Sequence, residues 1–255
     1  MLLAIDVGNT QTHVGMFREE ELAEHWRLAT DPEASADKLA TVLSSLLSLR
    51  DLGLRDVDAA IVSSVVPVLG HEYEQVSERY LGGALALVGP QLKIGMPIRM
   101  DNPHEVGADR IVNAVAAYEH CGGSCIVVDF GTSTNYDVVS PGGEYIGGVL
   151  APGVEISIEA LAQRAARLFK VDLDPPKQVI GKNTGAAIQS GVVFGFAGQV
   201  DTIIRRIREE LGEEATAIAT GGLAGPIVPF CEEVDEVDDL LTLTGLRLIW
   251  ERNQT

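Results

Sequence analysis

The chain has 255 residues, and its 37 acidic side chains outnumber its 19 basic ones, so the formal net charge is −18 at pH 7. A charge of this sign repels nucleic acid and anionic membrane surfaces, and we expect neither as a partner. Hydrophobic residues make up 46% of the chain, which is enough for a sizeable core. The three cysteines lack a metal-binding spacing, the N-terminus shows no leader pattern, and no apolar stretch approaches the roughly 20 residues of a membrane span. We therefore expect a soluble cytoplasmic protein.

An apolar run that ends in an acid, followed at once by glycine and hydroxyl or amide residues, occurs in each half of the chain. The first copy is LLAIDVGNTQT at residues 2–12, and the second is IVVDFGTST at residues 126–134. Strand-like sequence continues after each copy, so we expect each turn to close a β-hairpin, unlike the loop-to-helix turns of Walker and Rossmann sites. A single turn of this composition is also what any tight hairpin requires. Two copies in matching positions favour a duplicated fold.

Strand and helix patterns alternate along the rest of the chain. After the first hairpin, the first half contains an expected strand at 22–29, a helix at 37–49, a strand at 57–66 that ends before Pro67, a helix at 72–80, a strand at 84–88 and a helix at 111–118. After the second hairpin, the second half contains an expected strand at 145–150, helices at 154–168 and 184–211, a short strand at 216–222 and a C-terminal amphipathic helix. This alternation is typical of α/β layers, and we predict two domains, residues 1–120 and 121–255.

The residues of the two acidic turns suit phosphate binding. Glycine lets the backbone approach an anion closely, because no Cβ intervenes. The carboxylates of Asp6 and Asp129 can hold a cation or its water shell against phosphate oxygens. Hydroxyl donors are added by Thr10, Thr12, Thr132 and Thr134.

The segment DNPHEVGADR, residues 101–110, places Asp109 and Arg110 at the start of a helix. The positive end of the helix dipole favours an ionised acid there, one that is able to accept a proton. The planar guanidinium of Arg110 can clamp a carboxylate. An ordinary capped helix start with an exposed ion pair has the same pattern, and His104 is interpreted as a solvated loop residue.

Two later segments contain glycines beside polar residues. GKNTGAAIQSG at residues 181–191 puts Thr184 at the expected N-cap of a helix, and capping alone would explain that threonine. ATGG at residues 219–222 ends a strand in paired glycines, which offer a flat surface on which an adenine can rest. Tight packing of a helix against a strand explains these glycines equally well.

Taken together, these segments resemble the type III pantothenate kinases, a branch of the sugar kinase, Hsp70 and actin superfamily. The resemblance covers nearly the whole chain, because several motifs occur in the right order. The motifs are IDVGNT at 5–10, NPHEVGADR at 102–110, DFGTST at 129–134, GGVLAPG at 147–153, GKNT at 181–184 and TGGLA at 220–224.

The resemblance implies an α/β fold in which a ribonuclease H-like domain is duplicated, as in actin-like ATPases, giving two lobes with a central cleft for ATP. It implies transfer of a phosphoryl group from ATP to pantothenate, which yields 4'-phosphopantothenate in the first step of coenzyme A biosynthesis. Mg²⁺ would accompany ATP, and a monovalent cation, K⁺ or NH₄⁺, would be required. Members of the family are typically homodimers.

The resemblance also assigns roles to single residues. Asp109 would be the catalytic proton acceptor, Asp129 would bind the monovalent cation, and Asp6 would bind Mg²⁺ directly or through water. The ATP contacts would be Asp6, Val7, Gly8, Asn9, Thr10, Gln11, Thr12, His13 and Thr132. The pantothenate contacts would be Gly107, Ala108, Asp109, Arg110 and Thr184.

Two positions depart from the family pattern. Met100 stands where an aromatic residue is common, and Asn135 stands where a second threonine is frequent. Two other functions are weighed against the kinase: a non-catalytic regulatory accessory factor, and an enzyme of the same fold that acts on another small alcohol or on polyphosphate. The full set of Asp6, Asp109, Arg110 and Asp129 argues against lost catalysis.

Overall fold

A computed structural model describes residues 1–81, 83–164 and 170–254, and these residues form two compact units. Of these described residues, unit 1 contains those within 1–96, 101–116 and 240–254, and unit 2 contains those within 97–100 and 117–239. The predicted domain division between residues 120 and 121 stays a prediction. Relative to that division, residues 97–100 belong to unit 2, and residues 240–254 belong to unit 1.

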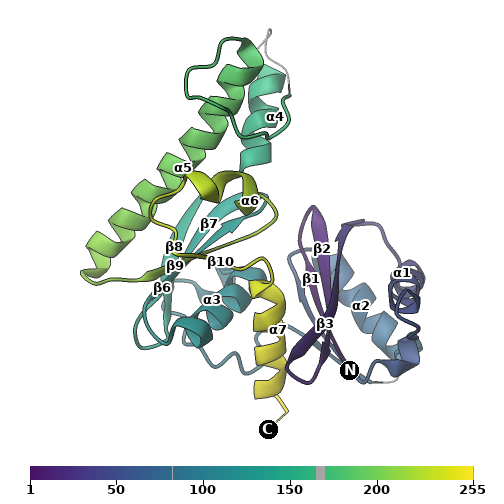
Figure 1. The fold of residues 1–255 in the computed structure, drawn as a ribbon. Helices are drawn as coiled ribbons and strands as arrows, with labels where there is room; N and C mark the ends of the chain where they lie inside the picture. Colours follow the sequence, from purple (N-terminus) through teal and green to yellow (C-terminus); the bar gives the residue numbers. More distant parts are fainter. Residues whose placement is uncertain (82, 165–169, 255) are drawn as a thin grey trace. The chain divides into compact units, whose positions relative to one another are not determined.

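Unit 1 is built on a five-stranded sheet in the order β3-β2-β1-β4-β5 (Figure 1). Its first two strands form the expected antiparallel hairpin, while β1 runs parallel to β4 and β4 parallel to β5. The strands are β1 Leu2–Val7, β2 Gln11–Arg18, β3 Glu21–Ala29, β4 Ala59–Ser64 and β5 Ala84–Leu87. The helices are α1 Ala36–Ser48, α2 Pro67–Tyr80, the first turns of α3 Ala108–Cys121, and α7 Leu241–Arg252, with 3-10 turns at Leu54–Asp56 and Pro103–Glu105.

Helices cover both faces of the first sheet. Val14 and Met16 of β2 belong to the same buried cluster as Leu43 of α1 and Leu69 of α2. Side chains alternate between the faces of a strand, so the intervening Gly15 faces the other way. A Cβ on Gly15 would lie 2.9 Å from the side chain of Leu243, which places α7 on the opposite face from α1 and α2 (Figure 1).

Unit 2 repeats the same topology. Its sheet has the order β10-β9-β6-β7-β8. Listed from the opposite edge, this is the order of the first sheet with each strand replaced by its counterpart. The strands are β6 Cys125–Phe130, β7 Ser133–Val139, β8 Tyr145–Pro152, β9 Thr216–Thr220 and β10 Glu236–Val237. The helices are α4 Val154–Arg164, α5 Thr184–Leu211 and α6 Ala224–Ile227, with a 3-10 turn at Val228–Phe230. The predicted duplicated α/β fold is therefore confirmed.

The long helix α5 forms much of the core of unit 2, through residues such as Val193, Val200 and Ile204. Its length and apolar composition would suffice for a membrane span, contrary to the expectation that no such stretch exists. Core helices of soluble proteins can have the same length and composition. Because α5 contributes to a packed core, its composition does not indicate a membrane protein.

Helix starts and one short strand differ from the local predictions. Pro67 begins helix α2, five residues before the expected start, because proline at the first helical position loses no hydrogen bond. Asn183 is the N-cap of α5, and its side chain accepts from the backbone N–H of Ala186, so Thr184 is the first helical residue instead. The two-residue strand β10 was not anticipated. The end of the helix expected at 154–168 lies outside the described residues.

Candidate active site

The first acidic turn follows β1 in unit 1. Asp6 lies opposite His13 on β2 and opposite Ser63 on β4, so the carboxylate stands where the hairpin meets the parallel strand. The backbone N–H of Gly8 donates to the carbonyl of Gln11 at 3.0 Å, which closes the turn. A Cβ at Gly8 would lie 2.9 Å from that same carbonyl oxygen, so the turn requires glycine.

Thr30, which follows β3, makes two hydrogen bonds to this turn. Its hydroxyl donates to the carbonyl of Gly8 at 2.8 Å, and its backbone N–H donates to the carbonyl of Thr10 at 2.9 Å. Nothing in the sequence near Thr30 indicated this role, since the contact joins residues from different strands. The exposed residues Asn9, Thr10 and Gln11 are thus presented by a turn that is hydrogen-bonded on both sides.

The second acidic turn follows β6 in unit 2. Asp129 lies opposite Asn135 on β7 and opposite Thr220 on β9, the same relation that Asp6 has in unit 1. Thr132 is exposed at the tip of the turn. Asn135 is buried and accepts a hydrogen bond from the hydroxyl of Ser133 at 2.8 Å, so this departure from the family pattern helps to order the turn.

Two glycines outside the turn shape the surroundings of Asp129 and Thr132. Gly221 has φ +94°, and a Cβ there would lie 2.5 Å from the Oδ1 atom of Asp129. A Cβ on Gly153 would lie 2.2 Å from the carbonyl oxygen of Thr132. Both glycines fall in the motifs noted in the sequence, but their contacts could not be assigned without the fold. They keep the second turn free of side chains from β9 and β8.

Helix α3 begins at Ala108, before the start of the helix expected at 111–118, and Asp109 lies in its first turn, as the sequence predicts. The Oδ1 atom of Asp109 accepts the backbone N–H of Arg110 at 2.9 Å. A Cβ on Gly107 would lie 2.5 Å from this oxygen, so the glycine makes room for the carboxylate. The three neighbouring residues Gly107, Ala108 and Arg110 are partly exposed.

Burial raises the pKa of Asp109, and this effect outweighs the opposing influence of the Arg110 N–H and of the nearby Arg110 charge. The helix start lowers the pKa of this carboxyl, as expected, but burial sets the net direction of the shift. A carboxylate with a raised pKa is a stronger base than an ordinary aspartate, which suits it to accept a proton.

The residues predicted for the site are divided between the two units. Unit 1 holds the turn from Asp6 to His13 together with the segment from Gly107 to Arg110. Unit 2 holds Asp129, Thr132 and Thr184. Thr184 is exposed at the start of α5, and Met100 lies beside Gly147 of β8, with its sulfur 3.6 Å from the position of a Cβ on that glycine.

Within the described residues, no group of three or more His, Cys, Asp or Glu side chains is placed to hold a metal ion. In nucleotide sites Mg²⁺ is commonly bound by one or two carboxylates together with phosphate oxygens and water. Asp6 offers one carboxylate at the first turn. Asp129 offers one carboxylate at the second turn. The space beside it is open because Gly221 has no side chain.

A profile of the type III pantothenate kinase family matches residues 2–206. A type III pantothenate kinase of Streptomyces griseus is 52% identical over 261 residues, which covers 99% of this chain and 98% of the relative.

Solved structures that are similar at low identity support the fold. One is a protein of Campylobacter jejuni described as a Baf family transcriptional activator, with a TM-score of 0.62 and 16% identity, covering 99% of this chain and 98% of that one. Another is an inorganic polyphosphate/ATP-glucomannokinase of an Arthrobacter strain, with a TM-score of 0.52 and 14% identity, covering 98% of each chain. At these identities the likeness concerns the fold, which is that of the sugar kinases and actin-like ATPases. The profile match and the 52% identity over nearly the full length show that the chain belongs to the type III pantothenate kinase family and is an enzyme.

Proposed function

We propose that the protein transfers the γ-phosphoryl group of ATP to pantothenate and so forms 4'-phosphopantothenate, the first step of coenzyme A biosynthesis. Family membership supports the reaction, because the relatives that carry this name match the chain from end to end. The observation that supports a residue-level account is the half-buried carboxylate of Asp109, which is held at the start of α3 with a raised pKa.

In the proposed reaction, the primary hydroxyl oxygen of pantothenate forms a bond to the γ-phosphorus of ATP. The bond between that phosphorus and the β–γ bridging oxygen breaks, and ADP leaves with the electron pair. Asp109 accepts the hydroxyl proton on its carboxylate. Such transfers depend mainly on the alignment of the two oxygens and on neutralisation of phosphate charge.

The neighbours of Asp109 bind the acceptor. Arg110 pairs with the pantothenate carboxylate, since its planar guanidinium matches two carboxylate oxygens. Gly107 and Ala108 supply a surface without bulky side chains, and Thr184 adds a hydroxyl contact from unit 2. Selection of an acid over a neutral alcohol follows from Arg110.

The two acidic turns bind ATP. The segment from Asp6 to His13 contacts the phosphates, through the backbone alone at the buried residues Val7 and Thr12. Thr132 contacts the phosphates from the second turn. Asp6 holds Mg²⁺, directly or through water, and Asp129 holds a monovalent cation, K⁺ or NH₄⁺. When bound, these cations offset the negative charge of the transferring group.

The enzyme is proposed to act as a homodimer in the cytoplasm. Support comes from large apolar side chains that unit 2 leaves exposed along β8 and α4. Leu150 is 65% exposed, and monomeric proteins rarely leave contiguous apolar patches of large size uncovered. The other exposed apolar residues of these two elements are Ile146, Val149, Ile156 and Leu161.

Two alternative functions have less support. A regulatory function agrees with the description of the Campylobacter jejuni protein as a transcriptional activator. At 16% identity, however, the likeness to that protein concerns the fold alone. A kinase for another small alcohol has the fold of the glucomannokinase, which is also a distant match. Neither accounts for family membership over nearly the whole chain.

An assay of ADP release tests the proposal. The enzyme is given ATP with pantothenate, with pantetheine, or with a panel of sugars, each with and without K⁺. We expect turnover with pantothenate that increases with K⁺, and little with sugars. Turnover with a sugar but not with pantothenate would show a kinase for another small alcohol. No turnover with any acceptor would favour the regulatory function.

A further inference from the structure

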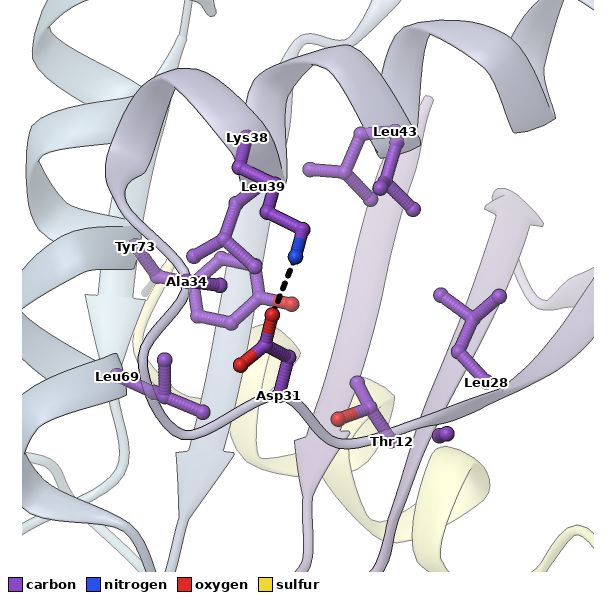
Figure 2. Close-up of a pocket in the computed structure, with 11 residues that line it drawn as sticks. Thr12, Leu28, Asp31, Ala34, Lys38, Leu39, Leu43, Leu69 and Tyr73 are labelled. Carbon is purple, nitrogen blue, oxygen red and sulfur yellow. Dashed lines mark hydrogen bonds and ion pairs between the residues drawn. The ribbon is translucent and has the colours of Figure 1, made fainter.

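Unit 1 contains a pocket that shares only Thr12 with the residues assigned to the proposed reaction. It lies between the helix pair α1 and α2 and the edge of the sheet formed by β2 and β3, with a volume of about 260 Å³ (Figure 2). Protein interiors normally leave few voids larger than one water molecule. An apolar cavity of roughly 150 Å³ is enough to bind benzene. The pocket therefore has room for a fused pair of rings or a short alkyl chain.

The walls of the pocket are mainly apolar. Leucine side chains line it from β3, α1 and α2, namely Leu28, Leu39 and Leu69, and Val42 lines it from α1. The ring of Tyr73 from α2 points into the same space (Figure 2). Tyr73 is only 3% exposed, and burial raises the pKa of its hydroxyl, so the ring stays neutral. Such walls favour an apolar occupant.

The mouth of the pocket carries a charged pair. Lys38 donates to Asp31 across the rim, and their side chains are 59% and 42% exposed (Figure 2). Asp31 also accepts the backbone N–H of Glu33, and the bond from Lys38 together with this one lowers the pKa of Asp31. Each rim charge already has a partner, and burial of an additional unpaired charge is costly. An uncharged occupant is therefore favoured.

One wall residue connects the pocket to the first acidic turn. The hydroxyl of Thr12 lies 2.9 Å from the hydroxyl of Thr30, which donates its single proton to the carbonyl of Gly8. Thr12 must then be the donor to Thr30. The pocket wall and the turn are thus joined by a chain of two hydrogen bonds, Thr12 to Thr30 to Gly8.

We propose that this pocket is a regulatory site for a small uncharged ring compound, and that its occupation strengthens ATP binding at the turn from Asp6 to His13. A ligand that fills an existing void selects the conformation in which the void is present. In that conformation Thr30 holds the turn at both Gly8 and Thr10. The coupling part of the inference rests on the proposed role of this turn in ATP binding, and the binding part does not.

The first experiment measures occupation of the pocket, with 5-fluoroindole as the probe and fluorine NMR line widths as the signal. Val42→Phe fills the pocket from a half-buried position, and Val68→Phe adds the same ring at an exposed site of α2, where the native valine is 63% exposed. We expect wild type and Val68→Phe to bind with a dissociation constant on the order of 1 mM or lower, as for a ligand of this size. Val42→Phe should weaken binding at least ~10-fold. No binding to wild type, or equal binding to Val42→Phe, would overturn the inference.

The second experiment measures the coupling, with the fluorescence of an N-methylanthraniloyl ATP analogue as the signal for nucleotide binding. Saturating 5-fluoroindole should lower the apparent nucleotide dissociation constant at least ~2-fold in wild type and Val68→Phe, and leave it unchanged in Val42→Phe. Thr30→Val should keep probe binding and lose the coupling. An unchanged or raised dissociation constant in wild type would refute the regulatory role.

The same measurements separate this inference from the proposed function. Normal pantothenate turnover without probe binding would refute the proposed regulatory site and leave the proposed function intact. A protein that binds the probe with intact coupling but does not phosphorylate pantothenate would support the regulatory site. The same result would refute pantothenate as the acceptor. A protein that binds the probe but no nucleotide would refute both the coupling and the kinase reaction.

Discussion

Gly245 of α7 lies directly against Val112 of α3. A Cβ on Gly245 would lie 2.2 Å from the carbonyl oxygen of Val112, closer than two such atoms can approach. The hydroxyl of Thr242 donates to the side chain of Asn113 at 2.7 Å, which adds a polar contact between the same two helices. Since α7 also packs on the sheet that carries Asp6, it connects the start of α3, with Asp109, to that sheet within unit 1.

We predict that Gly245→Ala displaces α3 and lowers both stability and turnover. The added methyl group has no space, and overpacking of this kind typically costs about 1–3 kcal/mol. Urea unfolding and the ADP-release assay measure the two effects. Gly198→Ala on α5 is the matched control, because a Cβ there meets nothing within 4 Å, and it should be stabilised by about 0.5–1 kcal/mol. Equal behaviour of the two variants would refute the close contact.

Gly221→Ala should weaken activation by potassium. The new Cβ would approach both Asp129 Oδ1 and the backbone of Phe130, and the residue would also be strained at φ +94°. We expect the K⁺ concentration for half-maximal rate to rise at least ~3-fold, a change of under 1 kcal/mol in cation binding. Gly212→Ala controls for backbone strain, since Gly212 has φ +69° and no neighbour within 4 Å. A similar loss of K⁺ activation in both variants would rule out a specific role of Gly221.

Asp109→Asn should make the protein more stable at neutral pH. Burial raises the pKa of Asp109 above its ordinary value of 3.8, so the unfolded chain gives up this proton at a lower pH than the folded protein. The contribution of the wild-type carboxyl to stability is present below its ordinary pKa and is lost as pH rises through the folded value. Urea midpoints of variant and wild type should therefore converge near pH 4 and separate, in favour of the variant, by pH 7. A variant that is less stable at pH 7 would contradict this assignment.

Leu150→Lys should shift the protein towards monomers. Leu150 is 65% exposed on β8, and a lysine there would bring a charge into the proposed subunit contact. Leu49→Lys is the control, because Leu49 is 64% exposed next to α1 in unit 1. Sedimentation velocity measures the masses. A dimer that withstands Leu150→Lys but not Leu49→Lys would place the contact elsewhere.

Local sequence predicted the two hairpins and most of the helices. The turns around Asp6 and Asp129 can be predicted from two local signals, which are the alternation of residues in the strands and the presence of Asp, Gly and Thr in tight turns. Both signals lie within about a dozen residues. The repeated order of strand, turn and strand along the second half also followed from the repeat of the acidic turn. Helix ends were less certain, because Asn183 and Thr184 are both good capping residues and the choice between them depends on the backbone.

The rest of the site depends on contacts between distant parts of the chain. Nothing local to Thr30, Gly221 or Gly245 shows that they touch Gly8, Asp129 and Val112. The net pKa shift of Asp109 was likewise inaccessible, since the sequence shows the helix start but not how deeply the carboxylate is buried. These features are set by tertiary packing, which overrides local preference.

The central claim is that Asp109 accepts the proton in phosphoryl transfer to pantothenate, and single-turnover kinetics of Asp109→Asn test it most directly. We predict that the variant binds ATP nearly as well as wild type and transfers phosphate to pantothenate at least ~10²-fold more slowly, as expected for loss of a general base. Asp109→Asn turnover close to the wild-type rate would contradict the account.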